Sequence, residues 1–274
     1  MKLPKYLILN KEIGETPLEV LDAFKAANHR YAAVPMSYAG RLDPLASGKL
    51  LVLVGEECKK QNKYMGLDKE YVFEVLLGMS TDTGDVLGMG ELGDPLPVAA
   101  PLDKQINDAV KKLTGKRTIP YPPFSSKTVK GQPLFKYALE GTIDTIEIPT
   151  KDVEIFSIQH IGTQTLDNKD LFFQISQKIE SIKPVTEHTK ALGNDFRRPE
   201  IRVRYEELKS ASEENKQFYI LKFRAVCSSG TYMRTLAQDI ARELGSVGLA
   251  FSIHRTKVGR FKTIGPISLW SKLF

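Results

Sequence analysis

The sequence predicts an α+β fold in which helices flank one large mixed sheet. The 274 residues contain short apolar runs typical of strands and longer segments with the apolar spacing of helices. These segments do not follow the regular strand–helix–strand order that builds a parallel α/β sheet. We find no internal repeat, and the chain is long enough to bury a sizeable core.

The expected helices have recognisable ends. Thr16 and Glu19 have the spacing of a capping box, and Pro17 suits the first helical position. Gly115 and Gly141 each follow a helical segment, where glycine commonly ends a helix. We therefore expect helices at about 17–28, 56–65, 102–113, 134–139, 231–244 and 267–273.

The expected strands are short and rich in apolar residues. The unbroken run at 50–54 suits a buried strand, and residues 70–79 alternate between apolar and other side chains. Residues 31–48 and 81–93 contain turn formers and little periodicity, which predicts loops. Strands are expected at 6–10, 50–54, 70–79, 153–161, 218–226 and within 249–261.

Residues 162–216 differ in composition from the rest of the chain. Polar and charged residues there are mixed with short apolar runs, such as the one at 171–175. We expect strands joined by mobile loops, with 181–200 as the least ordered part.

Charge and cysteine content restrict the classes of partner and compartment. The chain has 39 Lys and Arg against 33 Asp and Glu, a formal net charge of +6, which permits a polyanionic partner without establishing one. Cys58 and Cys227 are too few for a disulfide framework, and neither has metal-ligand spacing. The apolar run at 6–9 is too short for a signal peptide or a membrane span. We expect a cytoplasmic protein with no membrane association and no metal.

One stretch, residues 40–48, has features of a catalytic loop. It places Asp43 in a tight, non-helical turn directly before the apolar run at 50–54, and Pro44 biases Asp43 toward an extended conformation. A carboxylate fixed on a loop against a rigid sheet suits a nucleophile. An aspartate that only stabilises a turn would look the same, since Asp-Pro is common in turns. The local sequence leaves both interpretations open.

This stretch resembles the G-x-L-D-P-x-A-x-G motif of the tRNA pseudouridine synthase B (TruB) family. Four further blocks resemble that family in the expected order, and together the five span residues 5–261. The further blocks lie at Leu7–Thr16, Lys69–Asp85, Pro122–Tyr137 and Cys227–Leu236.

The resemblance implies a pseudouridine synthase fold, with a mostly antiparallel sheet and an active-site cleft across it. It implies isomerisation of the T-loop uridine of tRNA, conventionally numbered 55, in which the base is detached from C1′, rotated and rejoined through carbon. No cofactor or metal is implied. The expected partner is the T-arm of tRNA, and we expect a monomer.

Three residues are implied as the catalytic set. Asp43 matches the catalytic aspartate, and Tyr71 matches a tyrosine that stacks on the flipped-out base. Arg234 matches an arginine that pairs with the carboxylate and would keep it ionised. Judged from the local sequence, Tyr71 could equally pack within the sheet and Arg234 could be a solvated surface residue.

Five more residues are candidates for substrate contacts. Tyr232 matches a pocket-lining tyrosine, or it belongs to the core. Lys11 and Lys127 are candidates for phosphate contacts, although a lone lysine is usually a solvated charge. Tyr38 stands where the family usually has histidine. Arg41 replaces a small residue and resembles the R-L-D motif of the RluA family, which acts on ribosomal RNA.

The predicted organisation is one catalytic domain, 1–274, with an insertion at about 162–216 and without the C-terminal PUA domain of many family members. Two other functions remain open. One is a pseudouridine synthase acting on ribosomal RNA. The other is a non-catalytic RNA-binding or tRNA-folding protein on the same scaffold, against which the presence of Asp43, Tyr71 and Arg234 argues.

Overall fold

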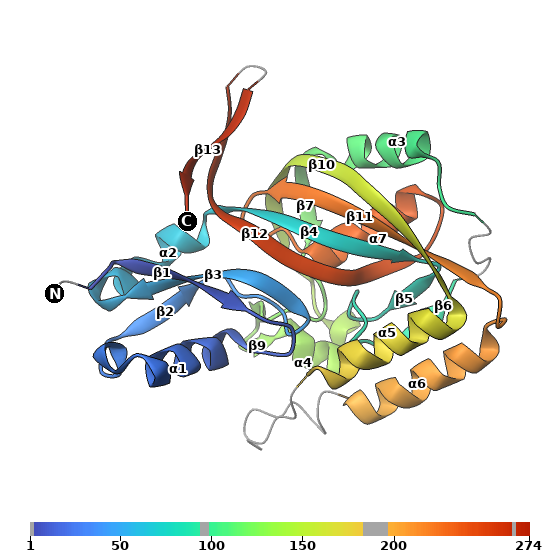
Figure 1. The fold of residues 1–274 in the computed structure, drawn as a ribbon, viewed down its shortest axis with the longest axis horizontal. Helices are drawn as coiled ribbons and strands as arrows, with labels where there is room; N and C mark the ends of the chain where they lie inside the picture. Colours follow the sequence, from blue (N-terminus) through green and yellow to red (C-terminus); the bar gives the residue numbers. More distant parts are fainter. Residues whose placement is uncertain (1–2, 94–98, 183–196, 265–266) are drawn as a thin grey trace.

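The computed structural model describes residues 3–93, 99–182, 197–264 and 267–274, and its main feature is a nine-stranded sheet (Figure 1). The strands of this sheet are β1 (Tyr6–Lys11), β2 (Met36–Ala39), β3 (Ala46–Val54), β4 (Asp68–Leu77), β7 (Gly115–Pro120), β10 (Thr150–Asp167), β11 (Gln217–Cys227), β12 (Gly248–Ile264) and β13 (Ile267–Leu273).

The sheet is mixed and mostly antiparallel, which confirms the predicted fold class. Its central order is β1-β3-β12-β4-β11-β10-β7, while β2 pairs with β3 and β13 pairs with β12. The pairing of β3 with β12 is parallel, and the other pairs in this sheet are antiparallel. Two small hairpins lie outside it, β5 (Met79–Thr81) with β6 (Gly90–Leu92) and β8 (Thr128–Val129) with β9 (Gln132–Pro133).

Helices cover both faces of the sheet. In β4, Phe73 and Val75 face a core shared with α3 and α7, whereas Leu76 faces the opposite core, shared with α5 and α6. The helices are α1 (Pro17–Ala27), α2 (Gln61–Met65), α3 (Asp103–Leu113), α4 (Leu134–Leu139), α5 (Asn168–Glu180), α6 (Arg198–Ala211) and α7 (Met233–Glu243).

Within 162–216, the prediction of strands and mobile loops was wrong for Asn168–Glu180 and Arg198–Ala211, which are helices. Strand β10 continues to Asp167, whose side chain accepts a hydrogen bond from Asp170 N (2.8 Å) and so caps α5. The apolar residues Leu171, Ile175 and Ile179 recur every four positions and are buried on one face of that helix. Helix α6 packs beside α5 (Figure 1). Of the predicted disordered part, 183–196 lie outside the described residues.

Three local predictions also differ from the structure. The C-terminal segment expected to be a helix is strand β13, which pairs with β12 and places Trp270 edge-on to Phe261. The expected loop at 31–48 contains β2 and the start of β3. The expected helix at 56–65 is a 3₁₀ turn, Gly55–Lys60, followed by the short helix α2. Sheet pairing, which the local pattern does not encode, decides the first two.

The loop between β2 and β3, which carries the Asp-Pro motif, is held by two buried cations. Lys11 of β1 donates from Nζ to the carbonyl oxygens of Ala46 (2.6 Å) and Pro44 (3.2 Å). Arg255 of β12 donates from its two Nη atoms to the carbonyl oxygens of residues 40–41, at 3.2 and 3.3 Å. Both side chains are fully buried. Because these contacts use backbone acceptors, they fix the loop without engaging its carboxylate.

Gly48 permits the parallel contact between β3 and β12. Its φ is +105°, and a Cβ at this position would overlap the backbone carbonyl of Arg255.

We expect Gly48→Ala to lower the free energy of unfolding by more than about 2 kcal/mol, since backbone strain and overlap with a strand combine. Gly55→Ala is the matched control, because φ is +61° there and no atom lies within 4 Å. Its cost should be about 1–2 kcal/mol. Urea unfolding measures both, and equal losses would contradict the contact.

Lys11 gives a second test of the loop anchor. Burial lowers the pKa of Lys11 from 10.5 to about 8. We expect Lys11→Met to lower the free energy of unfolding at pH 7 by about 1–3 kcal/mol, because buried carbonyls lose their donor. Between pH 8 and 10.5 the unfolded wild type binds more protons at Lys11 than the folded one, so wild-type stability gains from rising pH. The difference between wild type and variant should therefore widen from pH 7 to 9.5 in urea titrations. A narrowing gap would contradict this interpretation.

Candidate active site

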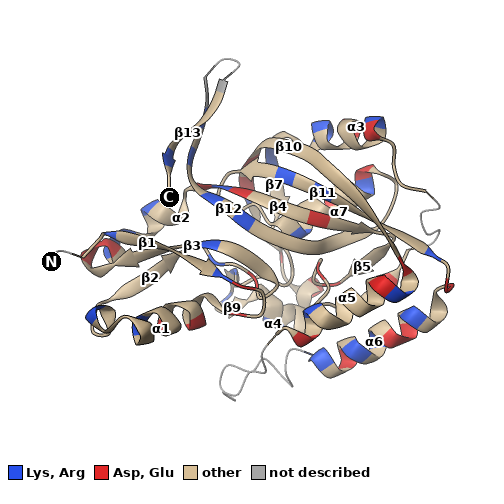
Figure 2. Ribbon diagram, viewed as in Figure 1, with Lys and Arg blue, Asp and Glu red and all other residues tan. Residues whose placement is uncertain are grey.

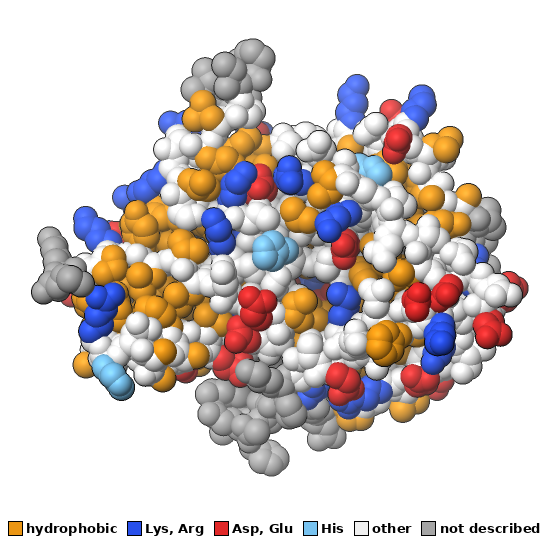
Figure 3. Space-filling view, viewed as in Figure 1, with side chains coloured by type: hydrophobic (Ala, Val, Ile, Leu, Met, Phe, Trp, Pro, Cys, Tyr) orange, Lys and Arg blue, Asp and Glu red, His pale blue; other side chains and the backbone are white. Residues whose placement is uncertain are grey.

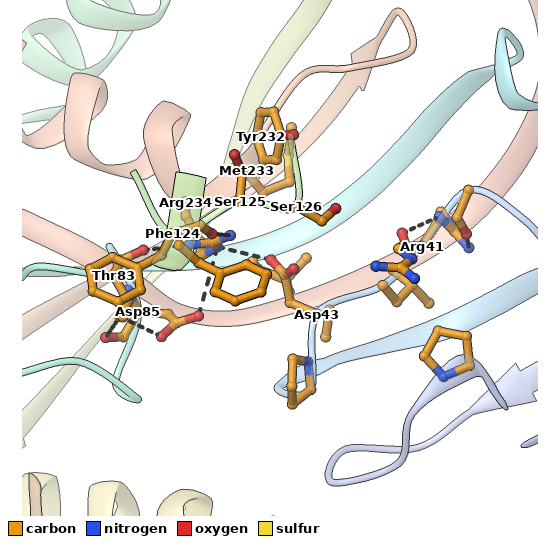
Figure 4. Close-up of a pocket in the computed structure, with 18 of the residues that line it drawn as sticks. Arg41, Asp43, Thr83, Asp85, Phe124, Ser125, Ser126, Tyr232, Met233 and Arg234 are labelled. Atoms are coloured by element: carbon orange, nitrogen blue, oxygen red, sulfur yellow. Dashed lines mark hydrogen bonds and ion pairs between the residues drawn. The ribbon is translucent and has the colours of Figure 1, made fainter. Parts of the chain in front are cut away.

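A cleft of about 850 Å³ lies beside the Asp43 loop. It is lined by residues that are far apart in the sequence: the loop 40–46, strand β4, the turn between β5 and β6, residues 121–127 and the start of α7. The close-up in Figure 4 shows Asp43, Asp85 and Arg234 together at its centre. The structure thus brings the predicted catalytic carboxylate and arginine to one place.

The Arg234 guanidinium is fixed by three different partners. Its Nε donates to Asp43 Oδ2 (2.8 Å), Nη1 donates to the carbonyl oxygen of Thr83 (2.6 Å) and Nη2 donates to that of Phe124 (3.0 Å). The Arg234 side chain is 7% exposed, whereas that of Asp43 is 41% exposed. Arg234 therefore orients the Asp43 carboxylate from the protein interior and leaves it accessible from the cleft.

Asp85 is a second carboxylate at this centre that the sequence did not single out. Its Oδ2 lies 3.8 Å from Arg234 Nε, and its Oδ1 accepts from Thr83 Oγ1 (2.9 Å) and Leu87 N (3.0 Å). Burial raises the pKa of Asp85. Burial alone would lower the pKa of Arg234, but the carboxylates of Asp43 and Asp85 outweigh burial and raise it. Asp85 is 6% exposed and also lines the cleft, so it supports Arg234 from the cleft wall. Its position at the end of the Lys69–Asp85 block was the available signal.

Two predicted tyrosines lie on the cleft walls. Tyr71 of β4 is buried in the core with Leu42 and also lines the cleft. Its stacking on a flipped-out base stays a prediction. Burial raises the pKa of Tyr71, which keeps its hydroxyl protonated at neutral pH. Tyr232 precedes α7 and meets the ring of Tyr121 edge-on, with centroids 6.1 Å apart. Burial also raises the pKa of Tyr232.

Of the other residues predicted to contact substrate, some line the cleft and one does not. Tyr38, Arg41 and Lys127 line the cleft, and Figure 4 shows Arg41 on the far side of Asp43 from Arg234. Lys127 Nζ lies 5.2 Å from the centroid of the Tyr121 ring. Lys11 does not line the cleft, because its ammonium is buried under the Asp43 loop. The structure therefore places Lys11 as a loop anchor and not, as expected, at a phosphate.

Three cations around the cleft were not recognised from the sequence. Arg255 anchors the Asp43 loop, and Lys69 donates to the carbonyl oxygens of Met65 (2.8 Å) and Leu67. Burial lowers the pKa of Lys69 to about 8. Lys151 of β10 lines the cleft, and burial together with the charge of Lys127 lowers its pKa. A lone basic residue in a strand carries no local signal of such a role.

A metal-binding cluster and a membrane-spanning helix are both absent from the part of the chain that the structure describes. There, no three His, Cys, Asp or Glu side chains are grouped so that they could hold a metal ion. None of the described helices has the length and apolar character needed to cross a membrane.

Comparison with known proteins agrees with this geometry. A family model described as TruB family pseudouridylate synthase (N terminal domain) matches residues 29–181. The tRNA pseudouridine synthase B of Borreliella afzelii is 31% identical over 261 residues, which cover 94% of this chain and 70% of that protein. The protein of the same name from Caldicellulosiruptor saccharolyticus is 27% identical and covers 96% and 70%.

A solved structure shows the same fold. A chain in the crystal structure of a Cbf5-Nop10-Gar1 complex superposes with a TM-score of 0.53 at 16% identity, covering 93% of this chain and 48% of that chain. At this identity the likeness concerns the fold alone. The family assignment rests on the sequence matches, which cover more than half of the chain. The chain belongs to the TruB family of pseudouridylate synthases.

Proposed function

We propose that this protein isomerises uridine to pseudouridine in tRNA, at the T-loop uridine conventionally numbered 55. The observation that carries the proposal is the carboxylate of Asp43, which is paired with the buried Arg234 and open to a cleft of nucleotide size. Relatives at 27–31% identity that carry the name tRNA pseudouridine synthase B support the choice of RNA.

Asp43 is the group that acts on the nucleotide. The Arg234 guanidinium donates to the Asp43 carboxylate and orients it, either to attack C1′ or to remove a proton from the sugar. In both routes the bond from C1′ to the base nitrogen breaks. The released base then turns and bonds to C1′ through a ring carbon; in the first route the bond from Asp43 to C1′ breaks, and in the second the sugar regains its proton. That ring carbon loses its proton, and the freed ring nitrogen takes one up. The cleft must therefore retain the free base during its rotation.

Tyr71 and Tyr232 supply surfaces for that base. A flipped-out base is commonly held against aromatic faces, which replace the stacking it loses in the RNA. Both tyrosines line the cleft that Asp43 faces, and both are protonated at neutral pH. They can accordingly hold the base without adding a negative charge next to the carboxylate.

Lys127 and Lys151 form a phosphate-binding pair at the same cleft. Each is half-buried, and among the described residues neither has a carboxylate within ion-pair distance. Their mutual repulsion contributes to the lowered pKa of Lys151. An anion between or beside them would relieve both the repulsion and the lost hydration. The phosphodiester backbone of the substrate strand supplies such an anion.

The central test is Asp43→Asn. We expect loss of detectable turnover with RNA affinity within about threefold of wild type, because the substitution removes the reactive charge but keeps the size of the side chain. Pseudouridine is mapped in total RNA from cells that carry the wild-type gene, the variant or neither. Loss of the signal at tRNA position 55 in the last two is expected. A signal that disappears from ribosomal RNA instead would identify the other substrate class.

The phosphate pair is tested by salt dependence. In the double variant Lys127→Gln with Lys151→Gln, the slope of log affinity against log salt should fall by about 0.7–0.9 for each lost phosphate contact. Lys104→Gln with Lys111→Gln is the matched control, since both lysines are exposed on α3 and neither lines the cleft. An equal change of slope in the two double variants would mean that the cleft lysines do not contact the RNA backbone.

A further inference from the structure

We infer that the hairpin of α5 and α6 braces the active centre and that Arg197, at its base, is a positioning residue for the Arg234–Asp43 pair. The inference rests on the proposed function, because it assigns a role within that reaction. It concerns the part of the chain, 162–216, that the sequence predicted as an insertion of strands and mobile loops.

The hairpin is joined to the catalytic loop through a common core. Helices α5 and α6 bury Leu171, Ile175 and Ile201 against the sheet. Leu45, two residues after Asp43, belongs to the same core and is itself buried. The loop that carries Asp43 and the hairpin thus share one core.

The end of α5 also reaches the catalytic loop through the N-terminal turn. Ser181 follows α5, and its carbonyl lies so close to Gly14 that a Cβ on Gly14 would overlap it. Gly14 N in turn donates to the carbonyl oxygen of Pro44 (3.0 Å), next to Asp43. A chain of backbone contacts therefore leads from the hairpin to the residue beside the catalytic carboxylate.

Arg197 touches the two segments that hold Arg234. Its Nη1 donates to Asp82 Oδ2 (2.7 Å), and its guanidinium carbon lies 4.9 Å from the centroid of the Phe124 ring. Asp82 is adjacent to Thr83, and the carbonyl oxygens of Thr83 and Phe124 are the acceptors for Arg234. Arg197 and Arg234 thus bridge the same two loops. Arg197 prevents a shift of either loop, and such a shift would displace the Arg234 guanidinium that pairs with Asp43.

Helix α6 supports one of these loops a second time. Arg204 Nε donates to the carbonyl oxygen of Gly90 (2.8 Å), and a Cβ on Gly90 would lie 2.8 Å from Leu208 Cδ1. Gly90 begins β6, the strand that follows the turn carrying Asp82 and Asp85. The hairpin therefore holds that turn at Asp82 and also at its exit.

The charges of the hairpin favour bracing over RNA binding. Figure 2 shows basic and acidic residues interspersed along α5 and α6, and Figure 3 shows mixed charges on this side of the molecule. Arg202 pairs with Glu180 (2.6 Å) and Arg204 pairs with Glu207 (3.1 Å). Arg197 lines the cleft but is likewise paired with a carboxylate, that of Asp82 (2.7 Å). These arginines are partly neutralised, unlike the two cleft lysines.

The test separates the chemical step from RNA binding. In Arg197→Gln we expect the single-turnover rate at saturating T-arm RNA to fall about tenfold, because Arg234 is less well oriented, with Kd changed by less than twofold. Arg197→Lys, which can still pair with Asp82, should recover most of the rate. The matched control is Arg202→Gln on α6, which removes one charge and the ion pair with Glu180 and should leave the rate and Kd unchanged.

A double-mutant cycle with Asp82→Asn tests the route. Asn keeps the oxygen that accepts from Met89 N, and the double variant should be no slower than Arg197→Gln alone. A higher Kd with a shallower salt slope and an unchanged rate would overturn the proposal and indicate that Arg197 contacts RNA. If both the rate and Kd were unchanged, the proposal would also be overturned. If thermal unfolding shows that Arg197→Gln is not folded, Asp82→Asn alone carries the test. An inactive wild type would refute the proposed function instead.

Discussion

The ion pair between Arg234 and Asp43 is the interaction on which the candidate site depends. It joins residues 191 positions apart and at the same time ties α7 to the loops that present Thr83 and Phe124. A buried guanidinium is stable only when its donors are satisfied, so these loops must be in place for Arg234 to sit where it does. The Asp43 carboxylate is therefore oriented only when α7, the Asp43 loop and the loops of Thr83 and Phe124 are all folded together.

The protein surrounds this pair with cations that do not compete for the carboxylate. Lys11, Lys69 and Arg255 are buried near the Asp43 loop and donate to backbone carbonyl oxygens. Carbonyl groups are present in every loop, so such contacts fix the backbone and leave Asp43 with its one guanidinium partner. Burial makes these ammonium groups less basic, which lowers the pKa of Lys11 and of Lys69 to about 8. The site thus combines a rigid loop with an accessible side chain.

The two cores of the sheet have different relations to the site. The core under α3 and α7 holds Tyr71 and the start of α7, which carries Arg234. The opposite core, under α5 and α6, holds Leu45 and the hairpin of β5 and β6. The catalytic loop lies where both cores meet, since Leu42 belongs to the first and Leu45 to the second. Changes in either core can consequently reach Asp43.

The sequence by itself determined the fold class and the family, and it singled out Asp43 and Arg234, which the structure pairs. These are recorded in residue order, as strand and helix periods and as ordered motifs that contain both residues. Only the tertiary structure decided what buried groups do. The positions of Asp85, Arg255 and Lys151 at the site depend on residues far away in the chain. Lys11 was expected to contact a phosphate, but it is buried as a loop anchor because β1 runs beneath the loop. The same holds for β13, whose partner strand outweighs its local pattern. Local sequence records propensity, whereas desolvation and strand pairing depend on which distant atoms fill the surrounding space.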